Sequence, residues 1–372
     1  MEGEIMKVIE YWIEGEIGNF IKVWISVYIS LSYCYFIGKI VPKGIKRLIP
    51  ILPVIFLFLI LPLNLHTMHL GITTAFFISW LSNFKLLMFS FDKGLLSDPS
   101  ISLPRFLAVA CLPIKIQQQQ TKSHKITDHR NQHHHHKSVF INYGIKGFLL
   151  ASMIKIYDYS DKIHPNIILV LYCFHIYFAL EIILGIAAAV ARGVVGVELE
   201  PTFNEPLLST SLQDFWGRRW NIMVNRILRP SVYDPVLTLS NKFLDRQWAP
   251  LPAVFCTFVV SGLMHELIFY YMGRRKPSGN ITLFFLIHGL CLVTEVAVKK
   301  AVNGRWELPR ALETVLVAGF VIGTGIWLFL PEMLQFNADV RAFEEYAAVG
   351  AFAKDVARAL TFIPSKNSTR VL

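Results

Sequence analysis

Long apolar runs are the feature that most constrains what this chain can fold into. Several of them approach 20 residues within a chain of 372. A helix of about 20 apolar residues matches the hydrocarbon thickness of a bilayer. Hydrophobic residues make up 54% of the chain and charged residues 17%, whereas soluble domains have about 45–50% and about 25%. The sequence therefore excludes a soluble enzyme, a secreted disulfide scaffold and a disordered chain, and it predicts a membrane protein.

The apolar runs predict an all-α polytopic fold with about eight transmembrane helices. The expected spans are 18–40, 48–65, 68–90, 139–157, 165–191, 250–272, 280–298 and 310–331. The fourth contains Lys146 and Lys155, so it either crosses the bilayer or lies in the interface. A further amphipathic helix near 338–361 is expected to lie flat on the membrane.

The basic residues lie mainly between the apolar runs. The net charge is +10, from 36 Lys and Arg against 26 Asp and Glu. Basic loops orient membrane helices and contact anionic headgroups, so this distribution argues against a nucleic-acid partner. Placing the basic residues of 39–47 and the Arg-rich segment 192–229 in the cytosol puts the N-terminus in the lumen. The basic run 274–276 then falls on the opposite side, so the topology stays open.

His265 is the strongest candidate for chemistry. It lies inside the apolar run 250–272, and an ionised side chain at that depth costs about 2.5–3.5 kcal/mol on insertion scales. Ser261 lies four residues earlier on the same helical face, whereas Glu266 points about 100° away. From these residues alone, His265 is either a neutral group bonded to a neighbouring helix or a catalytic base.

Two residue patterns together suggest acyl transfer from coenzyme A to a lipid alcohol. A buried neutral imidazole is suited to take a proton from a hydroxyl where water is excluded. The cluster Arg218, Arg219, Arg226 and Arg229 is suited to a phosphate-bearing carrier on the cytosolic side. The alternative for the arginine cluster is simple anchoring of a cytosolic loop.

Two segments resemble a known family. Thr210-Ser-Leu-Gln-Asp-Phe-Trp-Gly-Arg-Arg-Trp-Asn221, followed by Leu228-Arg-x-x-Val-Tyr-x-Pro235, resembles a loop of plant wax ester synthases. These are long-chain-alcohol O-fatty-acyltransferases of the membrane-bound O-acyltransferase family. Ser261-Gly-x-x-His265-Glu266, whose histidine follows Asn221 by 44 residues, resembles the family's second motif. The resemblance covers roughly residues 10–335.

The resemblance implies roles for the matching residues. His265 corresponds to the family's motif histidine, the expected general base, and Asn221 to the motif asparagine, a second catalytic or carbonyl-orienting residue. The other positions expected to contact substrate are Asp214, Trp216, Arg218, Arg219, Trp220, Ser261 and Glu266.

The resemblance also implies the substrates. The donor is a fatty acyl-CoA, which acts as co-substrate, and the acceptor is a long-chain alcohol, so that the product is a wax ester. No other cofactor and no metal is expected, and the protein is expected in the endoplasmic reticulum membrane among membrane lipids. The sequence leaves the oligomeric state open.

With this resemblance the chain divides into five parts. They are an N-terminal tail (1–16), N-terminal transmembrane helices (17–90), a flexible polar loop with poly-Gln and poly-His (91–138), the membrane-bound O-acyltransferase catalytic core around a lipid and acyl-CoA tunnel (139–335), and a C-terminal amphipathic tail (336–372).

Three alternatives remain at this point. The acceptor is instead diacylglycerol or a sterol, or the protein is a polytopic lipid transporter, or it is an inactive family member that acts as a scaffold. Broken helices with intramembrane His and Glu suit a transporter. However, the two halves of the chain show no similarity, and a transporter does not need the segment 210–221.

Overall fold

The computed structural model describes residues 13–112, 129–195, 202–302 and 308–361, and every regular element in these ranges is helical. The uninterrupted long helices are α2 (Gly18–Ile40), α3 (Ile45–Ile60), α7 (His129–Tyr157), α8 (Pro165–Val195), α12 (Pro250–Gly273), α13 (Asn280–Val302) and α16 (Ala338–Thr361). Two more long segments contain a wider turn, namely α4 (Met68–Ala75), η3 (Phe76–Ser82) and α5 (Asn83–Ser90), and α14 (Arg310–Thr324), η9 (Gly325–Phe329) and α15 (Leu330–Leu334).

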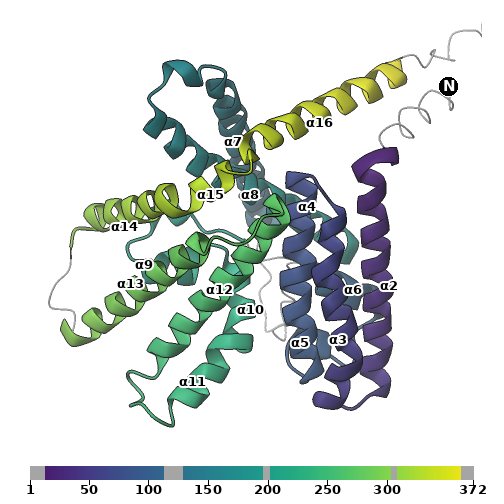
Figure 1. The fold of residues 1–372 in the computed structure, drawn as a ribbon, viewed down its shortest axis with the longest axis vertical. Helices are drawn as coiled ribbons and strands as arrows, with labels where there is room; N and C mark the ends of the chain where they lie inside the picture. Colours follow the sequence, from purple (N-terminus) through teal and green to yellow (C-terminus); the bar gives the residue numbers. More distant parts are fainter. Residues whose placement is uncertain (1–12, 113–128, 196–201, 303–307, 362–372) are drawn as a thin grey trace, which may run out of the picture.

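The N-terminal helices form a bundle of their own. Figure 1 shows α2, α3 and the α4–α5 segment side by side, while α12, α13 and α14 diverge from them. Leu31, Ile51 and Phe58 are fully buried between the bundle helices. Ile25 and Ile29 on α2 are 53% and 67% exposed. Apolar residues on the outer face are expected where the surroundings are lipid instead of water.

The prediction of a flexible loop over 91–138 is wrong for residues 103–111. Leu103–Cys111 forms helix α6, and its Phe106, Val109 and Ala110 are fully buried in the N-terminal core. This helix is short and adjoins a polar low-complexity run, so its apolar residues do not produce a span-length signal. Residues 129–138 belong to α7, and 113–128 lie outside the described residues.

Helices α7 and α8 pack antiparallel through a buried ion pair. The Lys146 ammonium bonds to the Glu181 carboxylate, and their side chains are 13% and 10% exposed. Toward the connection between the helices, the ring of Tyr157 lies 5.0 Å from that of Tyr172. The ion pair explains how a lysine is accommodated where α7 packs against α8.

Within the described residues, seven segments are long and apolar enough to cross a bilayer, and α7 is not one of them. The direction of the neighbouring helices nevertheless makes α7 a pass, which packs against α8. His175 of α8 lies near the start of α4, and Ala191 packs near α6, so α8 runs parallel to α4–α5. The chain must therefore return between Ser90 and Pro165, which the antiparallel α7 does. With α7 counted, the described residues make eight passes, of which seven have the length and hydropathy of a span, against the predicted number of about eight.

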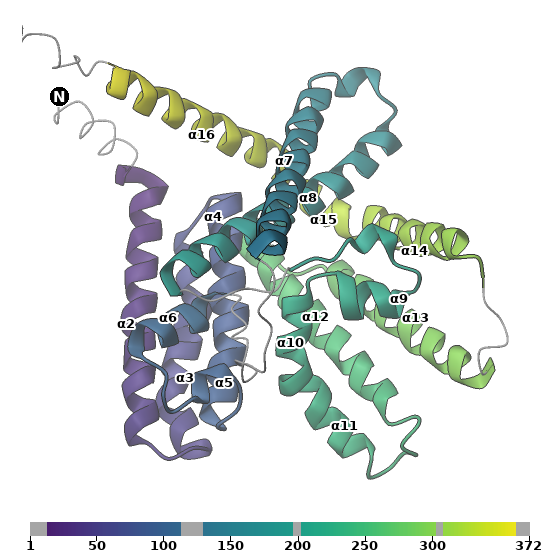
Figure 2. The same ribbon diagram turned by 180° about the vertical axis from the view of Figure 1, so that it is seen from behind.

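The C-terminal helices pack closely at α12 and α13. A Cβ added at Gly262 would lie 3.1 Å from the Cα of Thr282, and one at Gly289 would lie 2.8 Å from Phe258. The absent side chains allow this close approach. Between α8 and α12 the segment 202–249 carries only short helices: η6 (Pro206–Leu208), α9 (Leu212–Asp214), η7 (Phe215–Arg219), α10 (Ile222–Leu228), η8 (Arg229–Tyr233) and α11 (Asp234–Ser240). Figure 2 shows α10 and α11 beside α12 and α9 near α13.

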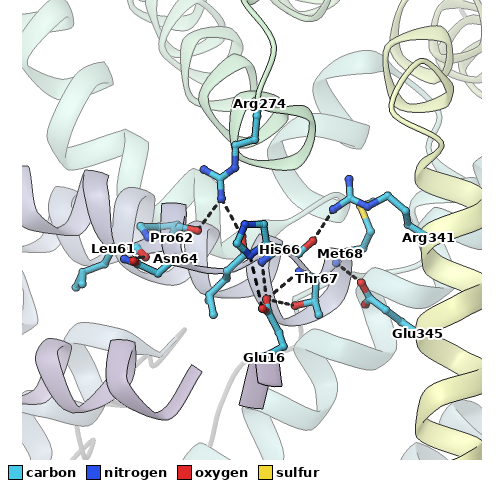
Figure 3. Close-up of polar contacts among 11 residues, drawn as sticks. Glu16, Leu61, Pro62, Asn64, His66, Thr67, Met68, Arg274, Arg341 and Glu345 are labelled. Atoms are coloured by element: carbon cyan, nitrogen blue, oxygen red, sulfur yellow. Dashed lines mark hydrogen bonds and ion pairs between the residues drawn. The ribbon is translucent and has the colours of Figure 1, made fainter. Parts of the chain in front are cut away.

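Charged side chains from three other parts of the chain hold the turn 61–68 between α3 and α4 (Figure 3). Arg274, at the end of α12, donates to two carbonyls of the turn at 2.8 and 3.2 Å. Arg341 donates to a third carbonyl of the turn, that of His66. The carboxylates of Glu16 and Glu345 accept hydrogen bonds from backbone amides of the turn. Arg274 is thus a structural residue, which accounts for a basic group on the side opposite the basic loops.

Candidate active site

The predicted site residues His265 and Asn221 line one cavity of about 370 Å³. The walls come from α4 and η3, α8, the segment 202–249, α12, α13, the α14–α15 segment and α16. Aromatic and aliphatic side chains form most of the lining, among them Phe76, Phe285 and Phe329. Such a surface accommodates hydrocarbon, with polar groups only at defined positions.

The His265 ring is fixed in one tautomer. Its Nδ1 lies 2.7 Å from the carbonyl oxygen of Ser261. A carbonyl only accepts hydrogen bonds, so Nδ1 carries the proton and Nε2 of the neutral ring keeps its lone pair. The ring lies between Phe285 and Trp80, with ring centroids 4.3 and 5.0 Å from its own, and the Trp80 ring is nearly perpendicular to it. His265 is therefore an oriented base on the wall of an apolar cavity.

Asn221 combines a left-handed backbone conformation with a side-chain amide that makes no hydrogen bond to the described part of the chain. It has a φ of 40° and a ψ of 58°, a left-handed conformation that asparagine tolerates better than most residues. Within the described residues its side chain makes no hydrogen bond, and its Oδ1 is buried. Buried amides are almost always bonded, so an unused amide at a cavity marks a candidate ligand-binding group.

Two predicted substrate residues, Trp216 and Trp220, also line the cavity. The Trp216 indole donates to Nδ1 of His288 at 3.1 Å, and Nε2 of His288 lies 2.8 Å from the Thr324 hydroxyl. His288 is thus fully bonded and structural. The ring of Trp220 stacks on Phe215 at 5.4 Å. These contacts fix the loop that carries Asn221 against α13 and α14.

Of the predicted charged residues of the loop, one pair is structural. The Nε of Arg219 donates to Asp214 at 2.6 Å, and its Nη1 lies 3.3 Å from the carbonyls of Asn204 and Glu205. Neither Arg219 nor Asp214 lines the cavity. Arg218 is exposed and makes no ion pair within the described part of the chain, so it alone of the three offers an unengaged charge.

Ser261 and Glu266 lie behind the cavity wall and position residues of the site. Both are buried and neither lines the cavity. Ser261 supplies the carbonyl that orients His265. The Glu266 carboxylate accepts from the backbone amide of Thr282 at 3.0 Å, in the first turn of α13. A carboxylate at that position satisfies an amide that the helix itself leaves unpaired.

A second group of polar residues lines the cavity at its α16 end, and sequence reasoning did not place it there. His69 Nδ1 lies 2.7 Å from Glu345, and the Tyr346 hydroxyl lies 3.1 Å from both His69 Nε2 and His175 Nε2. The Tyr172 hydroxyl donates to Asp339 at 3.0 Å. Histidines inside apolar runs were the available signal, but their partners come from helices far apart in the sequence.

Comparison with known proteins gives a consistent result. A model of the Membrane bound O-acyl transferase family matches residues 199–287, which include both Asn221 and His265. The acyl-CoA–sterol O-acyltransferase 1 of Arabidopsis thaliana is 52% identical over 92% of this chain and 98% of its own length.

Two further relatives carry another name. The long-chain-alcohol O-fatty-acyltransferase of Simmondsia chinensis is 42% identical over 90% of this chain and 95% of its own length. The probable long-chain-alcohol O-fatty-acyltransferase 1 of Arabidopsis thaliana is 43% identical over 92% and 98%.

Proposed function

This chain belongs to the membrane-bound O-acyltransferase family, and from that premise we propose that it transfers a fatty acyl group from acyl-CoA to a long-chain alcohol, forming a wax ester. The observation that carries the proposal is the oriented base. His265 presents an unprotonated Nε2 in an apolar cavity that also holds the unbonded amide of Asn221. The protein is a multi-pass membrane acyltransferase.

The reaction follows from these two groups. Nε2 of His265 takes the hydroxyl proton as the alcohol oxygen attacks the thioester carbonyl carbon. The Asn221 amide donates to the oxygen that becomes negative, and a donor of this kind is worth about 10²–10³ in rate. The carbon–sulfur bond then breaks, and the departing thiolate takes the proton from His265. The ester and free coenzyme A are the products.

The donor is proposed to enter from the segment 202–249. The nucleotide part of coenzyme A is large and charged, so an apolar cavity cannot take it up. Arg218 on this segment is exposed and available for phosphate, whereas Arg219 is engaged with Asp214. The acyl chain reaches His265 from this side, and the alcohol arrives from the bilayer.

A sterol is the second candidate acceptor, and the identity of 52% to a sterol O-acyltransferase favours it. Both acceptors present one hydroxyl on a large apolar body, so His265 would treat them alike. The cavity shape, to which many helices contribute, has to discriminate between them.

The test is an acyl transfer assay on the full chain reconstituted in vesicles with labelled oleoyl-CoA. Hexadecanol, a plant sterol and diacylglycerol are offered in parallel, and the lipids are separated by chromatography. We expect labelled wax ester from hexadecanol. Sterol ester as the main product would select the second candidate, and product from diacylglycerol alone would overturn both.

His265→Asn is the sharpest variant for the base. Its amide retains a donor toward the Ser261 carbonyl but has no Nε2. We expect ester formation to fall at least about 10²-fold, with unchanged protein yield and thermal unfolding midpoint. His66→Ala is the control, because the His66 side chain is 78% exposed and lies outside the cavity. Activity of His265→Asn near that of the control would refute the assignment.

The endoplasmic reticulum is the proposed location. It rests on the resemblance to wax ester synthases and on a cytosolic position for the basic segments, where acyl-CoA is met. Colocalisation of the tagged full chain with an endoplasmic reticulum marker is the expected result, and a plasma-membrane signal would contradict it.

A further inference from the structure

One face of α16 closes the cavity at the end away from the segment 202–249. Its lining residues are Ala338, Asp339, Ala342, Phe343 and Tyr346. They fall at positions i, i+1, i+4, i+5 and i+8, which share one side of a helix. Ala342 is the smallest cavity-lining residue on the face besides Ala338, which is already packed against Met68 and Met272.

Polar contacts hold this wall in place. Arg341 donates to the Met272 carbonyl at 2.8 Å and to the turn before α4 (Figure 3). Glu345 accepts from the first amides of α4, one of them at 2.9 Å. Tyr346 bonds to His69 and His175 at 3.1 Å each. A wall held by these contacts does not yield easily to an acyl chain that is too long.

The wall lies well beyond the reacting centre. His265 packs against Trp80, and α16 bonds to His69 on the same helical segment, 11 residues earlier. At about 1.5 Å per residue this separation is about 16 Å along the helix. The thioester carbonyl must lie at His265, and coenzyme A lies outside the cavity. The far end of the acyl chain therefore points toward α16.

We infer that the α16 face sets the longest acyl chain that the enzyme accepts, with Ala342 as the specificity-determining residue. This inference rests on the proposed function and names the part of the donor that the cavity measures. The shape of a hydrophobic pocket discriminates between chains that differ by single methylenes by about tenfold or more. A larger side chain at position 342 shortens the space and excludes the longest donors.

The experiment compares Ala342→Leu with Ala347→Leu, which makes the same change on the exposed side of the same helix. Each variant is given an acyl-CoA series from lauroyl to behenoyl with one fixed alcohol. For Ala342→Leu we expect the rate ratio of the longest to the shortest accepted donor to fall about tenfold, while Ala347→Leu keeps the wild-type profile. Ala342→Val is measured beside them, with a smaller shift expected, in case the larger residue prevents folding.

A second arm fixes the donor and varies the alcohol from decanol to docosanol. A shift confined to the donor series supports the inference. A shift in the alcohol series instead would show that the acceptor occupies the α16 end, and unchanged profiles in both series would remove α16 from chain selection. Absence of ester from every donor with the wild-type chain would refute the proposed function itself, which is a distinguishable result.

Discussion

At the scale of the single residue, Asn221 combines two properties that need separate tests. Its left-handed backbone starts α10, and its amide has unused hydrogen-bonding capacity at the cavity. A glycine keeps the first property and loses the second, because glycine adopts positive φ without a steric cost. Alanine loses both, since its Cβ disfavours that conformation.

We therefore expect Asn221→Gly to lower the ester-forming rate by about 10²–10³ with little change in the thermal unfolding midpoint. Asn221→Ala should lower both. Initial rates with saturating acyl-CoA, together with thermal unfolding in detergent, separate the two effects. Wild-type activity of Asn221→Gly would mean that the residue acts through its backbone and not through its amide.

The same scale shows how far sequence reasoning identifies a site. The positions of Asn221 and His265 follow from motif segments, and the structure brings both to one cavity. The partners of Arg219 and Glu266 do not follow, because Asp214 competes with phosphate for the guanidinium and the amide of Thr282 comes close only when α13 has packed. Composition indicates which groups carry charge, but packing decides which of them remain free.

At the scale of the element, α16 depends on a carboxylate. Burial raises the pKa of Glu345, but hydrogen bonds from His69 and from the amides of His69 and Met68 lower it, and the net pKa lies below the ordinary value. A lowered folded-state pKa means that the carboxylate stabilises the docked helix above the unfolded pKa, about 4.3 for Glu. That contribution is lost as the pH falls through the lower folded value.

We expect Glu345→Gln to lower the thermal unfolding midpoint at neutral pH, and the difference from wild type to shrink as the pH falls below about 4.3. Scanning fluorimetry across this range measures it. Glu344→Gln, next to it but exposed, is the control and should show no such trend. A difference that stays constant with pH would mean that Glu345 acts only as a neutral acceptor.

Element boundaries were predictable where hydrophobicity alone determines them. The spans near 18–40, 68–90 and 250–272 follow from the bilayer's thickness and match α2, α4–α5 and α12. Helix α6 was missed because nine residues, however apolar, carry no span-length signal. The amphipathic helix at 338–361 was predicted at the right place, but not its role as a cavity wall, since its polar partners lie on α4, α8 and α12.

At the scale of the whole molecule, the direction of each pass can be followed through contacts. Ile268 clusters with Ala75 and Met272 with Met68, so α12 runs antiparallel to α4–α5. The start of α12 therefore lies at the same end of the bundle as the turn between α2 and α3. This places the basic residues 39–47 and the segment before α12 on one side of the membrane, which resolves the topology that the sequence left open.

Labelling of single cysteines tests this arrangement in sealed microsomes. In a background without the native cysteines, Lys43→Cys and Lys242→Cys should react with an impermeant maleimide from the same side of the membrane. Ser278→Cys, in the turn after α12, should react only once the membrane is opened. All three positions are exposed. Equal labelling of Lys43→Cys and Ser278→Cys would contradict a chain of eight passes.

The contacts of α16 also set an order of assembly. Ribosomes make the chain from the N-terminus, and its parts pack as they emerge. Phe343 and Tyr346 follow the eight passes, yet they line the cavity that those passes enclose. A nascent chain halted before residue 338 would contain both His265 and Asn221, but its cavity would lack the wall that α16 forms. With the inferred role of α16, the enzyme can therefore select its donor by length only after α16 has been made and has packed.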